Sequence, residues 1–264
     1  MQTNDLKIAV VGAGNMGGAI VRALAKGRII ETRNIFVSDV SETNLNVLKN
    51  DFSEINIFTS NSEAVQQANI VILAVKPWLV EELSDEINAD GKILISVAAG
   101  IEFFELSKYF DTEKTALFRL IPNTAIEVGE SVSIVSSFDA PEEQIKLVLK
   151  IFGESGKTFL VPESQINAFM SLSSCGIAYA FRYIRAAMEG GIEMGISANT
   201  AKNVILQTLR GAVKLLETNN SHPEAEIDKV TTPGGITIKG LNEMEANGFT
   251  NAVIKGLKAS KITN

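Results

Sequence analysis

Residues 7–26 read KIAVVGAGNMGGAIVRALAK, and this stretch decides the fold class. It begins with Lys7–Val11, a short apolar run typical of a buried strand. Three glycines follow at Gly12, Gly14 and Gly17, and apolar residues at helical spacing continue to the end of the stretch. A strand, a glycine-rich turn and a helix in this order predict a unit that binds a dinucleotide.

Each glycine of this turn has its own expected role. Gly12 allows the tight turn, Gly14 lets the backbone approach the pyrophosphate, and Gly17 lets the helix pack closely on the strand. We expect the phosphates at the positive end of the helix, facing the free N–H groups near Asn15 and Met16. The alternative is a glycine turn that binds nothing, which the flanking strand and helix disfavour.

An acidic residue follows the second predicted strand. Asp39, next to Ser38, can accept hydrogen bonds from the adenosine ribose. Alternatively, Asp39 caps the next helix, although Ser41 could also do this. A carboxylate here repels a 2′-phosphate and Val40 supplies no cation, so the sequence favours NADH over NADPH.

The ends of three later strands supply further candidates for the cofactor site. Ligands of open α/β sheets bind at the carboxyl ends of the strands. The residues expected there are Ala74, Val75, Lys76, Pro77, Ala98, Ala99, Gly100 and Asn123. Each could instead serve only a turn, but their convergence on one edge favours a binding site.

The chain divides into an α/β half and a helical half. Strand-like apolar runs alternate with helical patterns over residues 1–162, which predicts a Rossmann-like, doubly wound and mostly parallel sheet. The expected strands are Lys7–Val11, Asn34–Ser38, Asn56–Phe58, Ile70–Val75, Lys92–Ala98, Ala116–Ile121, Ser131–Ser136 and Thr158–Val161. Residues 163–264 predict an all-α C-terminal domain. Its expected helices are Glu163–Met188, Ser197–Glu217, His222–Lys229, Gly234–Ala246 and Thr250–Lys258.

The first of these helices predicts a partner chain. Glu163–Met188 is apolar over much of its circumference, so it must be covered on several sides. We therefore expect a homodimer through the C-terminal domain. A capping box is expected at Ser221 and Glu224, and the single histidine, His222, is expected at the surface or as a cap.

Residues 228–238 read DKVTTPGGITI and predict a second ligand site. Thr232 fits a helix N-cap and Pro233 the first helical position. A helix that starts with two glycines exposes its N–H groups to a small carboxylate, although an ordinary capped helix has the same spacing. The candidate substrate residues here are Thr231, Thr232, Gly234, Gly235 and Thr237.

Composition excludes several classes of function. The net charge of −7 argues against nucleic acid and against an anionic membrane surface. Cys175 is the only cysteine, so the chain has no intrachain disulfide, and neither a zinc site nor another metal site is expected. The polar start of the chain does not match a signal peptide, and we expect a cytoplasmic enzyme.

Taken together, five segments resemble the pyrroline-5-carboxylate reductase family, and the segment 230–238 is the most specific of them. They are Gly-Ala-Gly-Asn-Met-Gly-Gly (12–18), Ala-Val-Lys-Pro (74–77), Ser-Val-Ala-Ala-Gly (96–100), Pro-Asn-Thr (122–124) and Val-Thr-Thr-Pro-Gly-Gly-Ile-Thr-Ile (230–238). The resemblance implies reduction of 1-pyrroline-5-carboxylate to L-proline with NADPH or NADH. It also implies a helical dimerisation domain, an active site at a subunit interface, and dimers that associate further into rings.

The resemblance also assigns roles to residues. It implies that the substrate carboxylate binds at Thr231–Thr237 and that Thr237, the catalytic candidate, hydrogen-bonds the ring nitrogen. Hydride would pass to the C=N carbon, which accepts it more readily when the nitrogen is protonated or hydrogen-bonded. No strong protein acid is then needed, and catalysis would depend mainly on holding ring and nicotinamide in contact.

Two places depart from the family pattern: Pro-Asn-Thr is followed by Ala125 rather than the common proline, and a segment of the long helix differs at several positions. The family has Leu-Ser-Gly-Ser-Gly-Pro-Ala-Tyr where this chain has Leu172-Ser173-Ser174-Cys175-Gly176-Ile177-Ala178-Tyr179. Ser173 and Cys175 are expected to line the substrate pocket, and Ile177 in place of proline predicts a less kinked helix. The changes leave two alternatives open: a related imine reductase with a different small substrate, and a non-catalytic dinucleotide-binding redox sensor.

Overall fold

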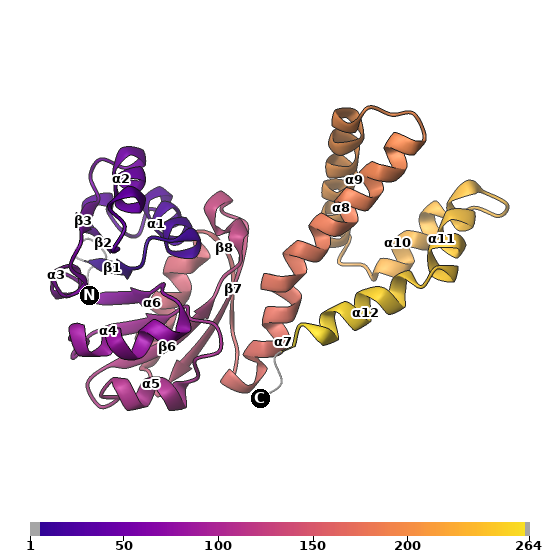
Figure 1. The fold of residues 1–264 in the computed structure, drawn as a ribbon. Helices are drawn as coiled ribbons and strands as arrows, with labels where there is room; N and C mark the ends of the chain where they lie inside the picture. Colours follow the sequence, from indigo (N-terminus) through magenta and orange to yellow (C-terminus); the bar gives the residue numbers. More distant parts are fainter. Residues whose placement is uncertain (1–5, 262–264) are drawn as a thin grey trace. The chain divides into compact units, whose positions relative to one another are not determined.

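The computed structural model describes residues 6–261, which fall into two compact units, 6–174 and 175–261 (Figure 1). The predicted domain boundary was after residue 162, whereas the first unit extends to Ser174. Residues 163–174, the first part of the predicted helical domain, therefore belong to the first unit. The reason is packing, because Ile166 and Met170 are buried with Ile121, Ile134 and Val161 in a small apolar cluster beside the sheet.

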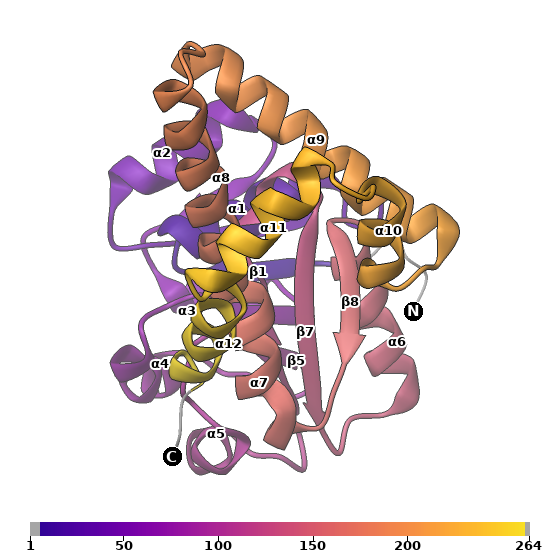
Figure 2. The ribbon, with the colours of Figure 1, turned by 90° about the vertical axis from the view of Figure 1, so that its right-hand side faces the viewer.

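The first unit is built on an eight-stranded sheet in the order β3-β2-β1-β4-β5-β6-β7-β8. All eight predicted strands are confirmed: β1 (Ile8–Val11), β2 (Ile35–Ser38), β3 (Asn56–Phe58), β4 (Ile70–Leu73), β5 (Ile93–Ser96), β6 (Ala116–Ile121), β7 (Ser131–Phe138) and β8 (Gly156–Leu160). Strands β1 to β6 are parallel, and β7 runs antiparallel to β6. Strand β8 lies parallel beside β7 (Figure 2). The mostly parallel sheet is therefore as predicted.

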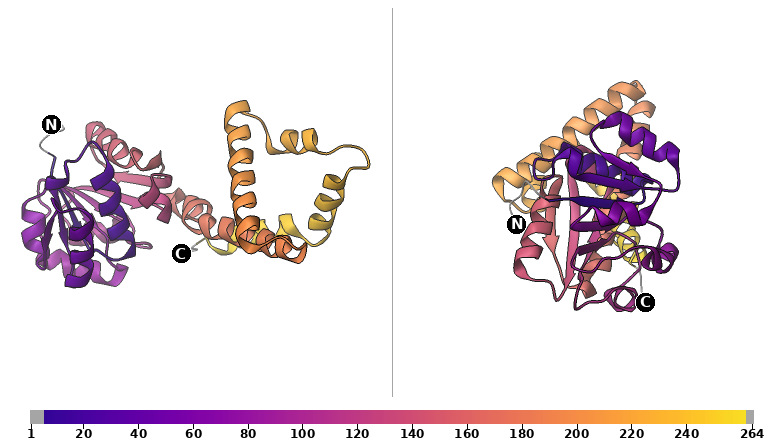
Figure 3. Two further views of the ribbon diagram at one scale, coloured as in Figure 1. Left: turned by 90° about the horizontal axis from the view of Figure 1, so that it is seen from above. Right: turned by 90° about the vertical axis from the view of Figure 1, so that its left-hand side faces the viewer.

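Helices cover both faces of this sheet (Figure 3). One core forms under α1 (Asn15–Lys26), α2 (Glu42–Asp51) and α6 (Glu142–Gly153). The other forms under α3 (Asn61–Gln66), α4 (Val80–Glu86) and α5 (Phe103–Tyr109). Because both faces are covered, every residue of β1, β2, β4 and β5 is buried, which explains their continuous apolar runs. Short 3-10 turns complete the unit at η2 (Thr32–Asn34), η3 (Pro77–Leu79), η4 (Thr124–Val128) and η5 (Glu163–Gln165).

The regular secondary structure of the second unit consists only of helices over its described residues, as predicted. It contains α8 (Gly176–Glu193), α9 (Ala198–Asn219), α10 (Pro223–Val230), α11 (Ile236–Ala246) and α12 (Phe249–Ala259). Large apolar side chains stay exposed in the single chain, including Val204 (57%), Val213 (56%) and Ile254 (52%). Apolar surface of this kind marks an interaction site.

None of the helices between residues 6 and 261 is both long and apolar enough to cross a membrane.

The predicted helix Glu163–Met188 is confirmed as one uninterrupted helical run, but it is not α-helical throughout. Helix α7 (Ile166–Met170) gives way to a π turn (Ser171–Cys175) before α8 begins. The hydroxyls of Ser171 and Ser173 donate to the carbonyl oxygens of Asn167 (3.0 Å) and Phe169 (2.9 Å). Serine hydroxyls that bond back to the helix in this way can distort it, so the change from α to π geometry at Ser171–Cys175 needs no proline.

The predicted capping box is also wrong. Ser221 Oγ donates to Glu226 rather than accepting from Glu224 N–H. His222 is the N-cap of α10, and its Nδ1 accepts from Glu224 N–H at 3.3 Å. The prediction that His222 has a capping position is therefore confirmed.

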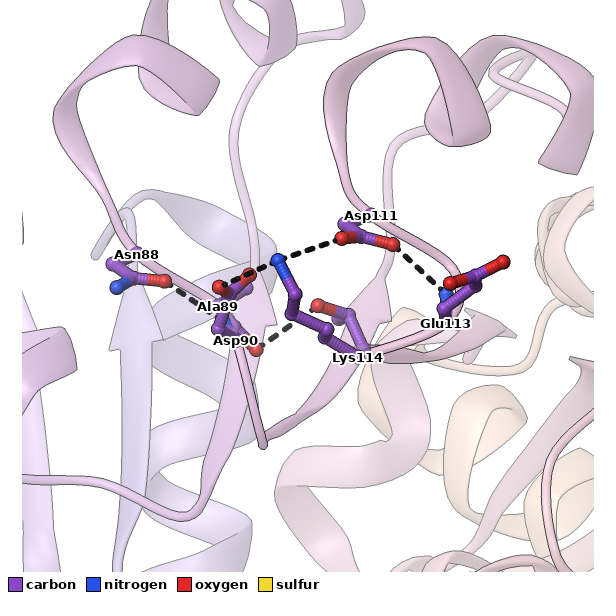
Figure 4. Close-up of polar contacts among 7 residues, drawn as sticks. Asn88, Ala89, Asp90, Asp111, Glu113 and Lys114 are labelled. Carbon is purple, nitrogen blue, oxygen red and sulfur yellow. Dashed lines mark hydrogen bonds and ion pairs between the residues drawn. The ribbon is translucent and has the colours of Figure 1, made fainter.

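An exposed polar network joins the loops that precede β5 and β6 (Figure 4). Lys114 Nζ lies 2.9 Å from Asp111 Oδ2 and 3.5 Å from Asp90 Oδ2. The hydrogen bond from Lys114 lowers the pKa of Asp111, and the same bond raises the pKa of Lys114. Asn88 Oδ1 accepts from Asp90 N–H, and Asp111 Oδ1 accepts from Glu113 N–H. These contacts order the amino-terminal ends of the strands at the surface, where ion pairs contribute little.

A buried ion pair ties η5 to the sheet. Arg119, on β6, is 3% exposed, and its Nη1 donates to Glu163 Oε1 at 2.7 Å. The same oxygen accepts from Phe103 N–H at 2.7 Å, at the start of α5. One carboxylate oxygen therefore joins β6, α5 and the start of the helical run.

Replacing Glu163 with alanine should lower the free energy of unfolding by about 3 kcal/mol, because Arg119 would keep a buried charge without its partner. Glu163→Gln should cost less, since its amide oxygen can still accept from Phe103 N–H. Urea denaturation of both variants would measure the difference. An alanine variant as stable as the wild type would contradict this role for the pair.

Candidate functional site

The glycine turn after β1 has the geometry expected of a dinucleotide site. Gly12 has a φ of +98°, and a Cβ there would lie 2.5 Å from Ala74 O, on β4's carboxyl side. A Cβ on Gly17 would collide with the Gly12 carbonyl oxygen. By contrast, a Cβ on Gly14 would meet nothing within 4 Å. Gly12 and Gly17 are thus required by the close backbone packing, whereas Gly14 leaves open space above the turn.

The start of α1 is open to an anion. Its N-cap is Gly14, with no side-chain capping bond, and its first turn contains no acidic residue. The first amides of an α-helix, here beginning at Asn15 and Met16, have no acceptor within the helix and point out of its positive end. These residues fit the pyrophosphate of a dinucleotide.

Asp39 holds the glycine turn. Its Oδ2 accepts from Ala13 N–H at 2.6 Å, and its Oδ1 accepts from Ser41 N–H at 2.7 Å. The carboxylate therefore bridges the turns after β1 and β2. Ser41 is the N-cap of α2, where its hydroxyl accepts from Asn44 N–H, so the alternative that Asp39 caps this helix is wrong.

A cavity of about 700 Å³ lies over this turn at the carboxyl ends of β1, β2, β4 and β5. This volume is within the usual range for a small-molecule site. The predicted cofactor residues that line it are Gly12, Gly14, Asn15, Met16, Asp39, Ala74, Val75, Lys76, Pro77 and Ala99. The structure thus brings together most of the residues that the sequence placed at this edge.

Five predicted cofactor residues lie outside the lining. Ser38 is fully buried and contributes its carbonyl oxygen, which accepts from Gly12 N–H at 2.8 Å. Ala98 is buried in the core under α3, α4 and α5. Asn123 is 7% exposed, and its side chain accepts from Ala125 N–H. Gly100 and Gly17 are likewise absent from the lining, and Gly17 serves the packing of α1.

Sequence reasoning missed one wall of the cavity, formed by α4 and the turn before it. The residues of this wall are Leu79, Glu82, Leu83 and Glu86. Their spacing of three and four places them on one helix face, which was the signal available in the sequence. The remaining lining residues outside the predicted set are Val11, Val40, Asn61 and Val97. The lining has acidic side chains at Asp39, Glu82 and Glu86, and Lys76 is its basic residue.

The loop before α11 differs from the prediction. Helix α11 begins at Ile236 with Gly235 as its N-cap, rather than at Pro233 with Thr232 as cap. Gly234 has a φ of +73°, and Gly235 N–H donates to Thr232 O at 2.9 Å, so these residues form a turn instead of helix. Thr231 Oγ1 donates to Ile227 O and Asp228 O, which closes the end of α10.

The start of α11 keeps the property that matters for an anion. It has no side-chain cap and no acidic residue in its first turn, and Thr237 is its second residue and is exposed. The first amides of α11 and Thr237 therefore both lie at the exposed amino end of the helix.

Glu226 orders the turn that leads into α10 and this loop. Its Oε1 accepts from Lys229 Nζ (2.7 Å), Ser221 Oγ (2.5 Å) and Asn219 Nδ2 (3.3 Å). These hydrogen bonds, led by that from Lys229, lower the pKa of Glu226 to about 2. The carboxylate is therefore charged throughout the neutral range and holds the connection between α9 and α10.

The two substrate candidates in the π turn have different surroundings. Ser173 is buried and its hydroxyl donates to the helix backbone, whereas Cys175 is a partly exposed free thiol. Neither observation gives Cys175 a base that would make it a nucleophile.

Two family models match the chain. The model described as "Pyrroline-5-carboxylate reductase dimerisation" matches residues 163–263. The model described as "NADP oxidoreductase coenzyme F420-dependent" matches residues 7–100. A pyrroline-5-carboxylate reductase of Methanosarcina acetivorans is 37% identical to this chain, over 97% of each protein. The chain belongs to the pyrroline-5-carboxylate reductase family.

Other relatives agree with this assignment. Pyrroline-5-carboxylate reductase 1 of Dictyostelium discoideum is 36% identical over 98% of this chain, which spans about half (49%) of that longer protein. A crystal structure of the pyrroline carboxylate reductase of Plasmodium falciparum with NADP bound is 28% identical. It has a TM-score of 0.89 and covers 97% of this chain and 96% of its own. The family's dimerisation model supports a homo-oligomer and fits the exposed apolar surface of the helical unit.

Replacing Gly14 with alanine should weaken dinucleotide binding about tenfold without lowering thermal stability, because the new methyl group meets no protein atom but occupies the approach to α1. Gly17→Ala is the matched variant, which should lose both stability and binding because its methyl group collides with Gly12. Fluorescence titration with NADH and thermal unfolding distinguish the two. Unchanged binding by Gly14→Ala would argue against phosphates at this helix start.

Proposed function

We propose that this protein reduces 1-pyrroline-5-carboxylate to L-proline with NAD(P)H. The observation that carries the proposal is family membership along nearly the whole chain, at 37% identity to a pyrroline-5-carboxylate reductase. The open helix start at Gly14 and the cavity above it support the cofactor, and the open start of α11 supports a carboxylate substrate. These are the two ligands that such a reaction requires.

The proposed mechanism uses few side chains. The amides at the start of α11 hold the substrate carboxylate, and the Thr237 hydroxyl hydrogen-bonds the ring nitrogen. The nicotinamide, when bound, supplies the hydride that the C=N carbon accepts. The imine can bind with its nitrogen already protonated, so hydride addition gives the neutral amine and no strong protein acid is needed; a hydroxyl backed by water is then sufficient at the nitrogen. Catalysis then depends mainly on orientation.

One assay separates this function from its rivals. The protein is mixed with NADH or NADPH and racemic pyrroline-5-carboxylate, and the absorbance of the reduced nicotinamide is followed. Rapid loss is the expected result. Cofactor binding without turnover would instead indicate a redox sensor, and turnover with other cyclic imines alone would indicate a related imine reductase.

Thr237→Ala should lower kcat about 10²-fold, the lower end of what a positioned proton donor contributes, and leave the Kd for NADH unchanged. Thr237→Ser keeps the hydroxyl and should retain most of the turnover. Steady-state kinetics on the three proteins would measure this. Wild-type turnover in the alanine variant would remove Thr237 from the mechanism.

For the cofactor, we propose a preference for NADH. Asp39 presents a carboxylate beside the turn, and the neighbouring Val40 is 93% exposed and uncharged. A 2′-phosphate would therefore meet a negative charge with no cation from this turn. The relative from Plasmodium falciparum was crystallised with NADP, so the proposed preference for NADH rests on Asp39 and Val40 of this chain alone.

Val40→Arg should raise kcat/KM for NADPH about tenfold relative to NADH, because an exposed guanidinium at this position can pair with the 2′-phosphate. Val40→Gln, a long but uncharged side chain, is the control. Kinetics with both cofactors give the ratio. A wild-type enzyme that strongly prefers NADPH would overturn the proposed preference.

For the assembly, we propose a homodimer through residues 175–261, with dimers that associate further into a ring. The exposed apolar side chains of α9 and α12 and the match to the family's dimerisation model support the dimer. Sedimentation velocity would distinguish the states. A monomer at micromolar concentration would contradict the dimer, and a dimer alone would contradict the ring.

A further inference from the structure

Ser174 differs from the two other serines of the π turn in what its hydroxyl contacts. The hydroxyls of Ser171 and Ser173 donate to carbonyl oxygens four residues back in their own helix. Ser174 Oγ donates instead to Pro122 O at 3.0 Å, on a segment 52 residues away in sequence. Within the described π turn, Ser174 is thus the serine that fixes the turn to another element.

The acceptor of this bond is itself firmly held. Pro122 is buried and follows β6 directly, at the carboxyl edge of the sheet. The next residue, Asn123, donates its N–H to Ser131 Oγ and accepts from Ala125 N–H. The Pro122 carbonyl is therefore a fixed point on the sheet.

Ser174 lies where its bond to Pro122 can hold two candidate substrate residues in place. Ser174 is the last residue of the first compact unit, and its two neighbours, Ser173 and Cys175, are the substrate candidates of the π turn. The hydrogen bonds of a π turn span one more residue than those of an α-helix, so a shift between the two forms would rotate the residues around it. A side-chain bond from inside the turn to the sheet disfavours such a shift.

We propose that Ser174 is a positioning residue, which anchors the π turn Ser171–Cys175 to the end of β6 and so fixes the orientation of Ser173 and Cys175 toward the substrate. The proposal deepens the proposed function and rests on it for its kinetic part. In this proposal the Ser174 hydroxyl acts through the backbone of the turn, by its bond to Pro122 O.

Ser174→Ala tests the anchor, and Ser171→Ala is the matched control. Each variant removes one hydroxyl from the same turn, but only Ser174→Ala removes the bond to the sheet. Loss of one such bond should lower kcat/KM for pyrroline-5-carboxylate about fivefold in Ser174→Ala, with little change in the Kd for NADH. Ser171→Ala should retain wild-type kinetics, and Ser174→Thr, which keeps the hydroxyl, should recover most of the loss. Equal kinetics of the two alanine variants would overturn the proposal.

Hydrogen exchange measures the anchor without substrate. The amides of residues 171–177 should exchange faster in Ser174→Ala than in Ser171→Ala, because the turn opens more often once its bond to Pro122 is gone. Equal exchange in the two variants would refute the anchor. If the wild type fails to reduce pyrroline-5-carboxylate, the proposed function fails, whereas this exchange comparison still decides whether Ser174 holds the turn.

Discussion

The cofactor site depends on the close approach of α1 to the turn after β1. Gly17 packs against the backbone of Gly12, and Gly12 packs against Ala74, the residue that follows the neighbouring strand β4. No side chain fits at either contact, so the turn stays tight and the amino end of α1 comes to the edge of the sheet. The anion-binding amides and the cavity of about 700 Å³ both follow from that placement.

Two carboxylates then hold the loops around this edge. Asp39 bridges the turns after β1 and β2 through two backbone amides. Glu163 binds Arg119 on β6 and the amide of Phe103 at the start of α5. Because each carboxylate joins segments that are distant in sequence, the carboxyl edge of the sheet is held by side chains as well as by its strands. Such preorganisation favours binding, because the loops lose less conformational entropy when a ligand binds.

The sequence predicted the parts of this protein that local patterns determine. The buried strands, the glycine turn and residues 74–77 of the site were readable because apolar runs and glycine spacing are local signals. The wall from Leu79 to Glu86 was missed because it comes from the helix after the strand rather than from the strand end. The start of α11 was misplaced because Thr-Pro-Gly-Gly fits a capped helix, whereas the positive φ of Gly234 makes a turn. The bonds of Asp39 to Ala13 and of Ser174 to Pro122 join residues that are distant in sequence, so no local sequence pattern predicts them.

Asp39 and its neighbour Val40 have different parts in the site: Asp39 supports the backbone of the glycine turn, and Val40 does not. Its carboxylate oxygens both support backbone amides, so a substitution at this residue would loosen the glycine turn together with any effect on the ribose. Val40, next to it, is 93% exposed and supports nothing of the kind. If the proposed role of this turn in coenzyme choice holds, a substitution at residue 40 can change that choice while the hydrogen bonds of residue 39 to the backbone stay intact.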